Sequence, residues 1–369
     1  MNIRKTGWLL SILFSLLFLG ATLHIWYKTY TTYDYVGDLA DVEQAKQFLK
    51  KNWEDKHPNL PALSYIPTGV YIDSLYFSGS HTVNIAGCLW QSYDKIKHKG
   101  VERKFLFADV VNSQSERVRL MRQYDDGKEE HLAWCFEVSL RQHPDRRKYP
   151  FDHETIALKI LPVDINVIFL PDYKSYNSTA TGIFGVSKHL KLPGFRVHET
   201  YFSYSLASYD TNFGIKDFDT TTGFPDLTFN MVLSRNIFQG VIFHLLPLFA
   251  VIILTFLFLS ISTHNKHKVE KYSFRTAGIL GSCAALFFIL VLSNLKLREE
   301  FAGSDIVFIE YFFILGYVMT VYVAINSVLL NIENHIAFIR YQDNLLPKIL
   351  YWPFLTGMAW LISFLVLCK

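Results

Sequence analysis

The chain has 369 residues, of which 50% are hydrophobic and 16% aromatic, and its formal charge is +3. This composition excludes a largely disordered chain and gives no sign of a nucleic-acid-binding surface. The hydrophobic residues are concentrated in a few long runs, which predicts a membrane protein with a separate water-exposed part.

The first apolar run, residues 8–23 (WLLSILFSLLFLGATL), follows Arg4 and Lys5. This layout is typical of a signal peptide or of an uncleaved anchor. No clean small-x-small cleavage site follows the run, which favours an anchor. We assign residues 1–29 to an N-terminal anchor or signal peptide, and cleavage stays open at this point.

Residues 30–63 are predicted to be a linker with an amphipathic helix from Asp41 to about Trp53. Apolar side chains recur there at three- and four-residue spacing, behind a capping residue that is Asp38 or Asp41. The repeating residues are Val42, Ala45, Phe48, Leu49 and Trp53.

Residues 64–235 alternate between apolar and polar residues in many short runs. The alternation is clearest in Leu132, Trp134, Phe136, Val138 and Leu140, and it recurs in Leu227, Phe229, Met231 and Leu233. Such a pattern indicates strands with one buried and one wet face. At least eight such runs, separated by turn signals, predict an antiparallel β-sandwich.

Four further apolar runs fill residues 236–369: Ile237 to Ile261, Phe274 to Leu295, Ile306 to Leu330 and Ile349 to Cys368. Each is long enough to cross a bilayer as a helix, which predicts a four-helix transmembrane domain. Short cytoplasmic connections are enriched in Lys and Arg. The basic connection from His264 to Arg275 is therefore expected inside, and the mixed connection from Lys296 to Asp305 outside. The sandwich is then exported, and the chain ends outside at Lys369.

No motif for catalysis occurs: there is no GxSxG, HExxH, phosphate-binding glycine loop or CxxC. The histidines have no metal-binding spacing, so we expect neither an enzyme nor a metal site or cofactor. Cys88 and Cys135 lie in strand-like runs of the exported part, and the sequence leaves open whether they form a disulfide or remain free thiols.

Three motifs occur in a fixed order along the chain. A turn between two predicted strands reads Tyr149-Pro150-Phe151-Asp152, the last strand ends in LSRN with Arg235, and the next apolar run contains LLP with Pro247. With this order and topology, residues 64–369 resemble a subunit of the pentameric ligand-gated ion channels (Cys-loop receptor-like family).

The resemblance is to the prokaryotic branch of this family. Animal members close the turn with a disulfide whose cysteines would fall near Gln142 and at Ile156, and neither residue is Cys here. The resemblance implies a homopentamer in the bacterial inner membrane, surrounded by lipids, with a ligand-binding-type sandwich on the periplasmic side. A small extracellular ligand or protons would open the pore. The alternative is a membrane-anchored sensor or binding protein that does not conduct.

The resemblance also assigns a role in gating to the motif residues. Pro150 and Phe151 would rest on the connection between the second and third bundle helices, Leu295 to Asp305. Asp152 would pair with Arg235 at the root of the first bundle helix. His244 and Glu310 are further ionisable residues at membrane depth, where they raise the question of proton sensing.

Two registers of the second bundle helix fit the resemblance. In the first, the pore is lined by Glu270, Ser273, Thr276, Ala277, Leu280, Ala284, Phe287 and Val291, with Leu280 as an apolar gate, and the Glu270-Lys271 mouth favours cations. In the second, Arg275, Ile279 and Ser282 face the pore, and the Arg275 ring favours anions. We prefer the first register.

Family members bind agonists between subunits, beneath the hairpin that joins the last two strands. This hairpin would run here from Tyr209 to Phe224. Tyr209, Phe213 and Phe218 would form walls around a cationic or aromatic ligand, with Asp217 and Asp219 as polar partners. Structural packing is the competing interpretation of these aromatic residues.

Overall fold

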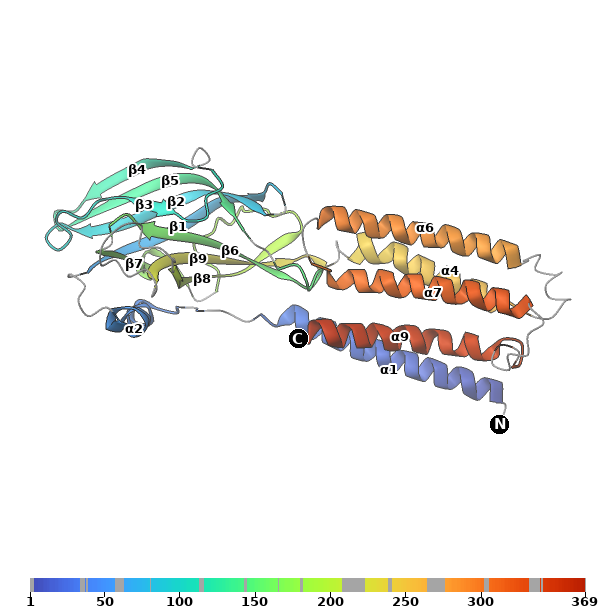
Figure 1. Ribbon diagram of the computed structural model, residues 1–369. Coiled ribbons are helices and arrows are strands. Elements are labelled where there is room, and N and C mark those ends of the chain that lie inside the picture. Colours follow the sequence, from blue (N-terminus) through green and yellow to red (C-terminus); the bar gives the residue numbers. More distant parts are fainter. Residues whose placement is uncertain are drawn as a thin grey trace. The chain divides into compact units, whose positions relative to one another are not determined.

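The computed structural model describes residues 3–33, 37, 39–56, 63–79, 81–112, 116–142, 145–164, 166–179, 182–207, 223–237, 241–263, 276–301, 305–331, 339 and 341–368. The chain forms two compact units (Figure 1). The helical unit comprises Met1–Tyr33, Asp145–Asp152 and Asn236–Lys369, and the β unit comprises Asp34–Pro144 and His153–Arg235.

The β unit contains two sheets. The first has the strand order β4-β5-β2-β1-β7 and the second the order β3-β6-β9-β8. All pairings are antiparallel except that of β1 with β7. The strands are β1 (Ser64–Phe77), β2 (Thr82–Asp94), β3 (Phe105–Phe107), β4 (Arg117–Asp125), β5 (Glu129–Arg141), β6 (His153–Pro162), β7 (Val167–Pro171), β8 (Phe195–Ala207) and β9 (Phe224–Arg235).

The two sheets enclose one hydrophobic core, as the alternating sequence predicts. On β5, Leu132, Trp134, Phe136, Val138 and Leu140 are all buried, and the residues between them are more exposed. Each strand contributes one face to the core because successive side chains point to opposite faces of a sheet. The prediction of a β domain with antiparallel sheets is thus confirmed.

β7, β9 and β4 depart from the expected pattern of one buried and one wet face. β9 is buried at nearly every position and β7 at every position. β4, an edge strand of the first sheet whose neighbour is β5, is exposed at every position. Val118, Leu120 and Met121 of β4 therefore lie at the surface of the single chain.

The predicted amphipathic helix is present as α2 (Val42–Asn52), and Asp41 is its N-cap. The Asp41 carboxylate accepts a hydrogen bond from the Gln44 backbone N–H at 2.7 Å. Ala45, Leu49 and Trp53 are buried in the core of the β unit. The β unit therefore extends toward the N-terminus beyond Ser64, since α2 packs as part of it and does not act as a free linker.

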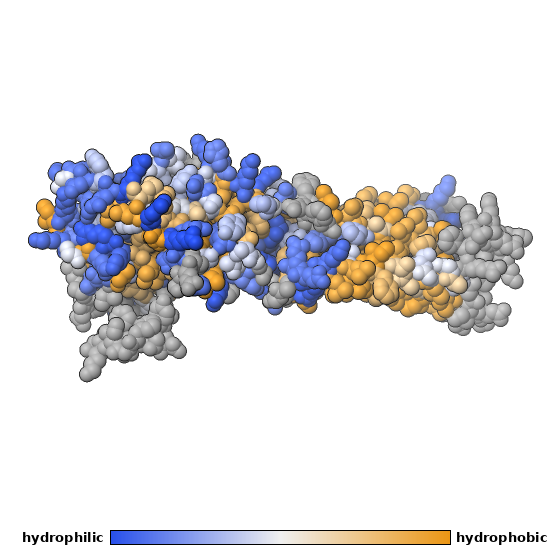
Figure 2. All heavy atoms as spheres, turned by 90° about the horizontal axis from the view of Figure 1, so that it is seen from above, coloured by the Kyte–Doolittle hydropathy of each residue, from blue (hydrophilic) through white to orange (hydrophobic). Residues whose placement is uncertain are grey.

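The helical unit contains five apolar helices that run alongside one another (Figure 1). Four of them are long and apolar enough to cross a membrane, and α4 is a shorter apolar helix preceded by the π-helical turn η4 (Val241–Leu245). The visible surface of this unit is predominantly hydrophobic (Figure 2). The helices are α1 (Ile3–Thr31), α4 (Leu246–Ile261), α6 (Thr276–Glu300), α7 (Phe308–Asn331) and α9 (Leu345–Leu367).

Successive helices α4, α6, α7 and α9 alternate in direction, and α1 runs parallel to α9 (Figure 1). α6 extends to Glu300, beyond the predicted end of its apolar run at Leu295. The charged stretch that starts at Lys296 is therefore mostly the last turn of a helix, and the connection to α7 is shorter than expected. Two ion pairs hold this helix end: Arg298 with Glu310 at 2.8 Å and Glu300 with His244 at 3.3 Å.

α1 packs along α9 through specific contacts. The Ser11 hydroxyl donates to the Ile349 carbonyl at 2.6 Å, and the Trp26 indole N–H donates to the Ser363 hydroxyl at 2.9 Å. Between them, the rings of Phe18 and Trp360 lie 5.9 Å apart. Hydrogen bonds between side chains in a span fix the rotation of one helix against the other.

Candidate functional site

The turn between β5 and β6 is part of the helical unit. Asp145–Asp152 is grouped with the helices, although the chain before and after it belongs to the β unit. The Arg147 guanidinium closes the start of the turn by binding the Asp145 carboxylate at 2.6 Å and 2.9 Å. The Arg147 carbonyl accepts a hydrogen bond from the Phe308 backbone N–H at the start of α7, at 2.8 Å. Backbone and side chains thus both attach the turn to the helices.

Tyr149 is inserted at the end of α6. Its side chain is 2% exposed, and its ring lies 4.5 Å from the ring of Phe301 and 5.8 Å from that of His244. On the same phenylalanine, the Arg146 guanidinium lies 5.6 Å from the ring centre, within the range of a cation–π contact. Tyr149 therefore contacts both η4, which leads into α4, and the segment after α6.

Phe151 is inserted between α1 and α7. It is 5% exposed, and its ring lies 5.3 Å from that of Trp26 and 6.0 Å from that of Phe308. Trp26 also contacts Phe312 at 5.8 Å. These four rings form an aromatic cluster, which buries large apolar surfaces and has edge-to-face geometries that resist displacement.

The sequence places Pro150 and Phe151 on the connection from Leu295 to Asp305. In the structure, Tyr149 and Arg146 of the turn contact Phe301 of this segment, while Phe151 reaches α7 and α1. The contact with Trp26 could not be predicted, because the motif resemblance begins only at residue 64.

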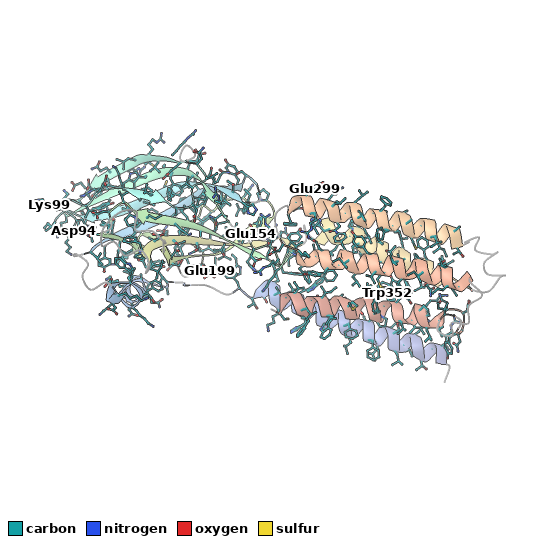
Figure 3. The ribbon with its side chains drawn as sticks, in the orientation of Figure 1. Asp94, Lys99, Glu154, Glu199, Glu299 and Trp352 are labelled. Carbon is teal, nitrogen blue, oxygen red and sulfur yellow. The ribbon has the colours of Figure 1, made fainter. Side chains whose placement is uncertain are left out.

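Arg235, the last residue of β9, forms a buried ion pair within the β unit. Its Nη2 lies 2.8 Å from Oε1 of Glu154 (labelled in Figure 3), whose side chain is 2% exposed. The guanidinium also lies 4.4 Å from the ring centre of Phe195. Sequence reasoning missed Glu154, although it lies only two residues after Asp152, the last residue of the motif. The predicted pair of Asp152 and Arg235 joins residues of different units and stays a prediction.

Pro247 is the second residue of α4, directly after the π-helical turn η4. Since proline has no backbone N–H, it interrupts the hydrogen-bond ladder where the π-helical turn gives way to the α-helix. The LLP motif therefore marks a change of helix type at the start of α4.

The α6 residues that would line the pore in the two registers differ in how deeply they are buried. Ile279 is 4% exposed and faces the other helices together with Cys283, Leu286 and Leu290. Leu280 is 37% exposed, and Ala277 and Ala284 are also exposed; Thr276 and Val291 are half-buried. Phe287 is partly covered by Tyr317 of α7, with ring centres 5.0 Å apart.

Several predicted site residues lie outside the described residues. These are Glu270, Ser273 and Arg275 at the expected pore mouth, and the hairpin residues Tyr209, Phe213, Asp217, Phe218 and Asp219.

A hollow of about 470 Å³ lies on the outer face of the first sheet. Trp90 of β2, Arg122 and Tyr124 of β4, and His131 of β5 contribute to its walls. The Trp90 indole N–H donates to the Asp172 carboxylate at 2.9 Å, which holds the ring in place. This volume lies within the range typical of small-molecule sites. Sequence reasoning missed this hollow because its residues come from four strands and from the segment after β7.

Asp226 of β9 is a buried carboxyl in the β unit. It is 2% exposed, and its Oδ1 has no hydrogen-bond partner among the described residues. Burial raises its pKa to about 7; nearby Asp109 acts in the same direction, and Lys159 opposes the shift. Lys159 is itself paired with Asp109 at 2.9 Å. Asp226 therefore changes charge near neutral pH inside the sandwich.

In comparisons with known proteins, no family model and no curated protein sequence matches this chain.

The aromatic contact of Phe151 with Trp26 should be measurable as a coupling energy. We expect Phe151→Ala and Trp26→Ala each to destabilise the helical unit, and the double variant to lose about 0.5–1.5 kcal/mol less than the sum, because an aromatic pair contributes that much beyond area burial. Thermal unfolding of the full chain in detergent measures this. As a control, Phe151→Ala should add to Trp360→Ala, which contacts Phe18 instead. Additivity of the Phe151 and Trp26 variants would contradict the cluster.

Removal of Glu154 should leave the Arg235 charge poorly compensated. We expect Glu154→Ala to lower the free energy of unfolding of the β unit by about 3–5 kcal/mol, as for other buried pairs that lose one partner. The matched control is Glu137→Ala, which removes an exposed carboxylate 3.7 Å from Arg117 and should cost less than about 1 kcal/mol. Equal losses in the two variants would show that the Glu154–Arg235 pair is energetically no different from a surface pair.

Asp226 should make the β unit less stable as pH rises. An unfolded aspartate loses its proton near pH 4, whereas folded Asp226 keeps it until about pH 7, so stability falls between these values and the loss is complete above pH 7. We expect Asp226→Asn, which mimics the protonated form, to match the parent at pH 4 and to exceed it at pH 8 by up to about 4 kcal/mol. Parallel stability curves for the two proteins between pH 4 and pH 8 would refute this assignment.

Proposed function

We propose that this protein is the subunit of a homopentameric ion channel that opens in response to a ligand or a pH change outside the cell. The proposal rests on the burial of the turn Asp145–Asp152 within the helical unit. Its two ends continue directly into β5 and β6, while Tyr149 and Phe151 are buried against α6, α7, α1 and η4. A displacement of these strands would therefore act directly on helix ends.

The burial of individual α6 side chains supports the first pore register. Ile279 of the second register lies on the face that packs against the chain's own helices, whereas Ser282 is half-buried and Arg275 lies outside the described residues. A side chain in that position is not available to line a lumen. Leu280, Ala277 and Ala284 remain uncovered by the chain itself. We infer that these residues face the pore, with Leu280 as the apolar ring that dewets in the closed state. This register favours cations.

The surface of the β unit supports assembly into an oligomer. β4 is exposed on both faces and carries apolar side chains, and it leaves one edge of the first sheet unpaired in the single chain. Long edges of this kind are normally shielded in soluble domains. Neighbouring subunits of a ring would cover β4.

The stimulus is a small extracellular molecule or a proton. The hollow beside Trp90 is large enough for a small ligand, and its mixture of Arg122, Glu129 and Tyr124 suits a polar or zwitterionic one. Asp226 is the candidate for proton sensing, since its titration near pH 7 changes the charge inside the sandwich.

The topology follows from the charge distribution and from the helix directions. The start of α6, which follows the basic stretch in the sequence, and the start of α1, which contains Arg4, lie at one end of the helical unit, and the turn Asp145–Asp152 contacts the other end. We infer that the first end is cytoplasmic and that the β unit is exported. We further infer that α1 is retained as a fifth span, because Trp26 supports both Ser363 and Phe151.

Currents across a planar bilayer that contains the purified full-length protein test the function. Channel openings that depend on pH or on a screened small molecule support the proposal. A protein that assembles but passes no current under any of these conditions would instead favour the non-conducting sensor.

Replacement of the apolar ring should open the channel. We expect Leu280→Ser to raise the basal conductance because a polar ring remains hydrated. Leu365→Ser is the matched control, since Leu365 is similarly exposed but lies on α9, and it should leave the conductance unchanged.

Cysteine substitution then maps the pore face of α6 in a Cys283→Ala background. Water-soluble thiol reagents should modify cysteines at 277, 280 and 284, and spare position 279. The reverse order of reactivity would select the second register and predict anion selectivity.

A further inference from the structure

Three sulfur atoms meet on the outer face of the first sheet. Cys88 of β2 lies directly opposite Cys135 of β5, and their Sγ atoms are 3.5 Å apart. The Sγ of Cys135 is 3.2 Å from the Sδ of Met121 on β4. Both cysteines are free thiols. Three neighbouring strands thus each contribute one sulfur atom to the same place.

A β-bulge brings the third sulfur into this group. In the pairing of β4 with β5, Leu120 is opposite Trp134 and Arg122 is opposite Ala133, so Met121 is the extra residue of a bulge. A bulge changes the direction of the side chain that it inserts. Arg119, which is the direct partner of Cys135 in the ladder, is not the residue that contacts its sulfur.

The possible metal ligands at this place are three sulfur atoms, which are soft donors. Thiolate and thioether ligands select Cu(I), zinc and iron–sulfur clusters. Structural zinc takes four ligands and iron–sulfur clusters are held by four cysteines, so a set of two thiolates and one thioether best suits Cu(I). Among the described residues, no three His, Cys, Asp or Glu side chains come together as metal ligands. The third ligand at this site would be a methionine, which further disfavours zinc.

Two of the sulfur–sulfur distances are close to those around a three-coordinate ion. Metal–sulfur bonds of about 2.3 Å place the sulfurs of a planar three-ligand site about 4 Å apart. The Cys88–Cys135 and Cys135–Met121 distances, 3.5 Å and 3.2 Å, are each less than about 1 Å shorter than this value. Met121 is about half exposed, so an ion has access from solvent, and its side chain can rotate outward to make room.

We propose that Cys88, Cys135 and Met121 form a binding site for a single Cu(I) ion on the surface of the β unit. Binding replaces the two thiol protons, which are released to solvent, by the metal, and the thioether joins as a neutral ligand. The ion connects β2, β5 and β4, and so it holds the exposed edge strand to the sheet. The site is independent of conduction.

A disulfide between the same cysteines is the competing use of this pair. It would require an external oxidant to remove two electrons from the thiols, and it would not involve Met121. The bulge that directs Met121 onto Cys135 favours the metal site.

Competition for Cu(I) tests the proposal. The full chain, with Cys283→Ala and Cys368→Ser to leave only this pair, is reduced under anaerobic conditions and titrated against the Cu(I)–bicinchoninate complex. We expect one Cu(I) per chain and a higher melting temperature of the β unit, because the ion binds only the folded arrangement. X-ray absorption should show sulfur neighbours at about 2.3 Å.

Substitutions of individual ligands test how much each sulfur atom contributes to Cu(I) binding. Cys135→Ser should weaken Cu(I) binding at least 100-fold, and Met121→Leu, which preserves apolar volume on an exposed side chain, should weaken it about tenfold without changing stability in the absence of metal. Unchanged affinity in Met121→Leu would overturn the three-sulfur site. A reduced parent chain that takes up no Cu(I), or a Cys88→Ser, Cys135→Ser double variant that binds as tightly as the parent, would overturn the proposal altogether.

Discussion

The burial of Tyr149 and Phe151 among helices is the interaction on which the rest of the molecule depends. Both residues lie in a short turn between two strands, where large apolar side chains would ordinarily be exposed to water. The helical unit provides the pockets that bury them: Phe301 and His244 for one ring, and Trp26, Phe308 and Phe312 for the other. Because the turn has no disulfide to close it, these contacts and the Arg147–Asp145 pair determine its conformation. The turn is therefore held by the helical unit, while its two ends continue along the chain into β5 and β6.

Charged side chains pair within each of the two units. In the β unit, buried Glu154 pairs with Arg235, the last residue of β9. In the helical unit, Arg298 binds Glu310 and Glu300 lies beside His244, but Arg298 and Glu300 are exposed. Breaking a buried pair is costly, whereas exposed charges are screened by water. The Glu154–Arg235 pair is therefore the most costly of the three to break.

The edge strand β4 connects two of the proposals. In the proposed oligomer a neighbouring subunit would cover its exposed apolar side chains, and its bulge at Met121 supplies the third sulfur of the proposed Cu(I) site. An ion bound there would stiffen the edge that meets the neighbour. The hollow beside Trp90 lies on the same sheet, and Arg122 of β4 lines it. Ligand, metal and assembly would thus all act on one strand.

The sequence by itself determined the elements whose physical basis is local. Alternation over residues 132–140 specified a strand with one buried face, Asp41 specified the start of α2, and the long apolar runs specified helices able to span a bilayer. The sequence also pointed to the turn and to Arg235. Only the tertiary structure decided which groups meet: Trp26 with Phe151, Glu154 with Arg235, and Met121 with Cys135. These pairs are separated by many residues, and periodicity reports which face of an element is buried but not what buries it. The burial of β9 on both faces and the exposure of β4 on both faces also depend on which other parts of the chain cover each strand, which its own pattern does not report.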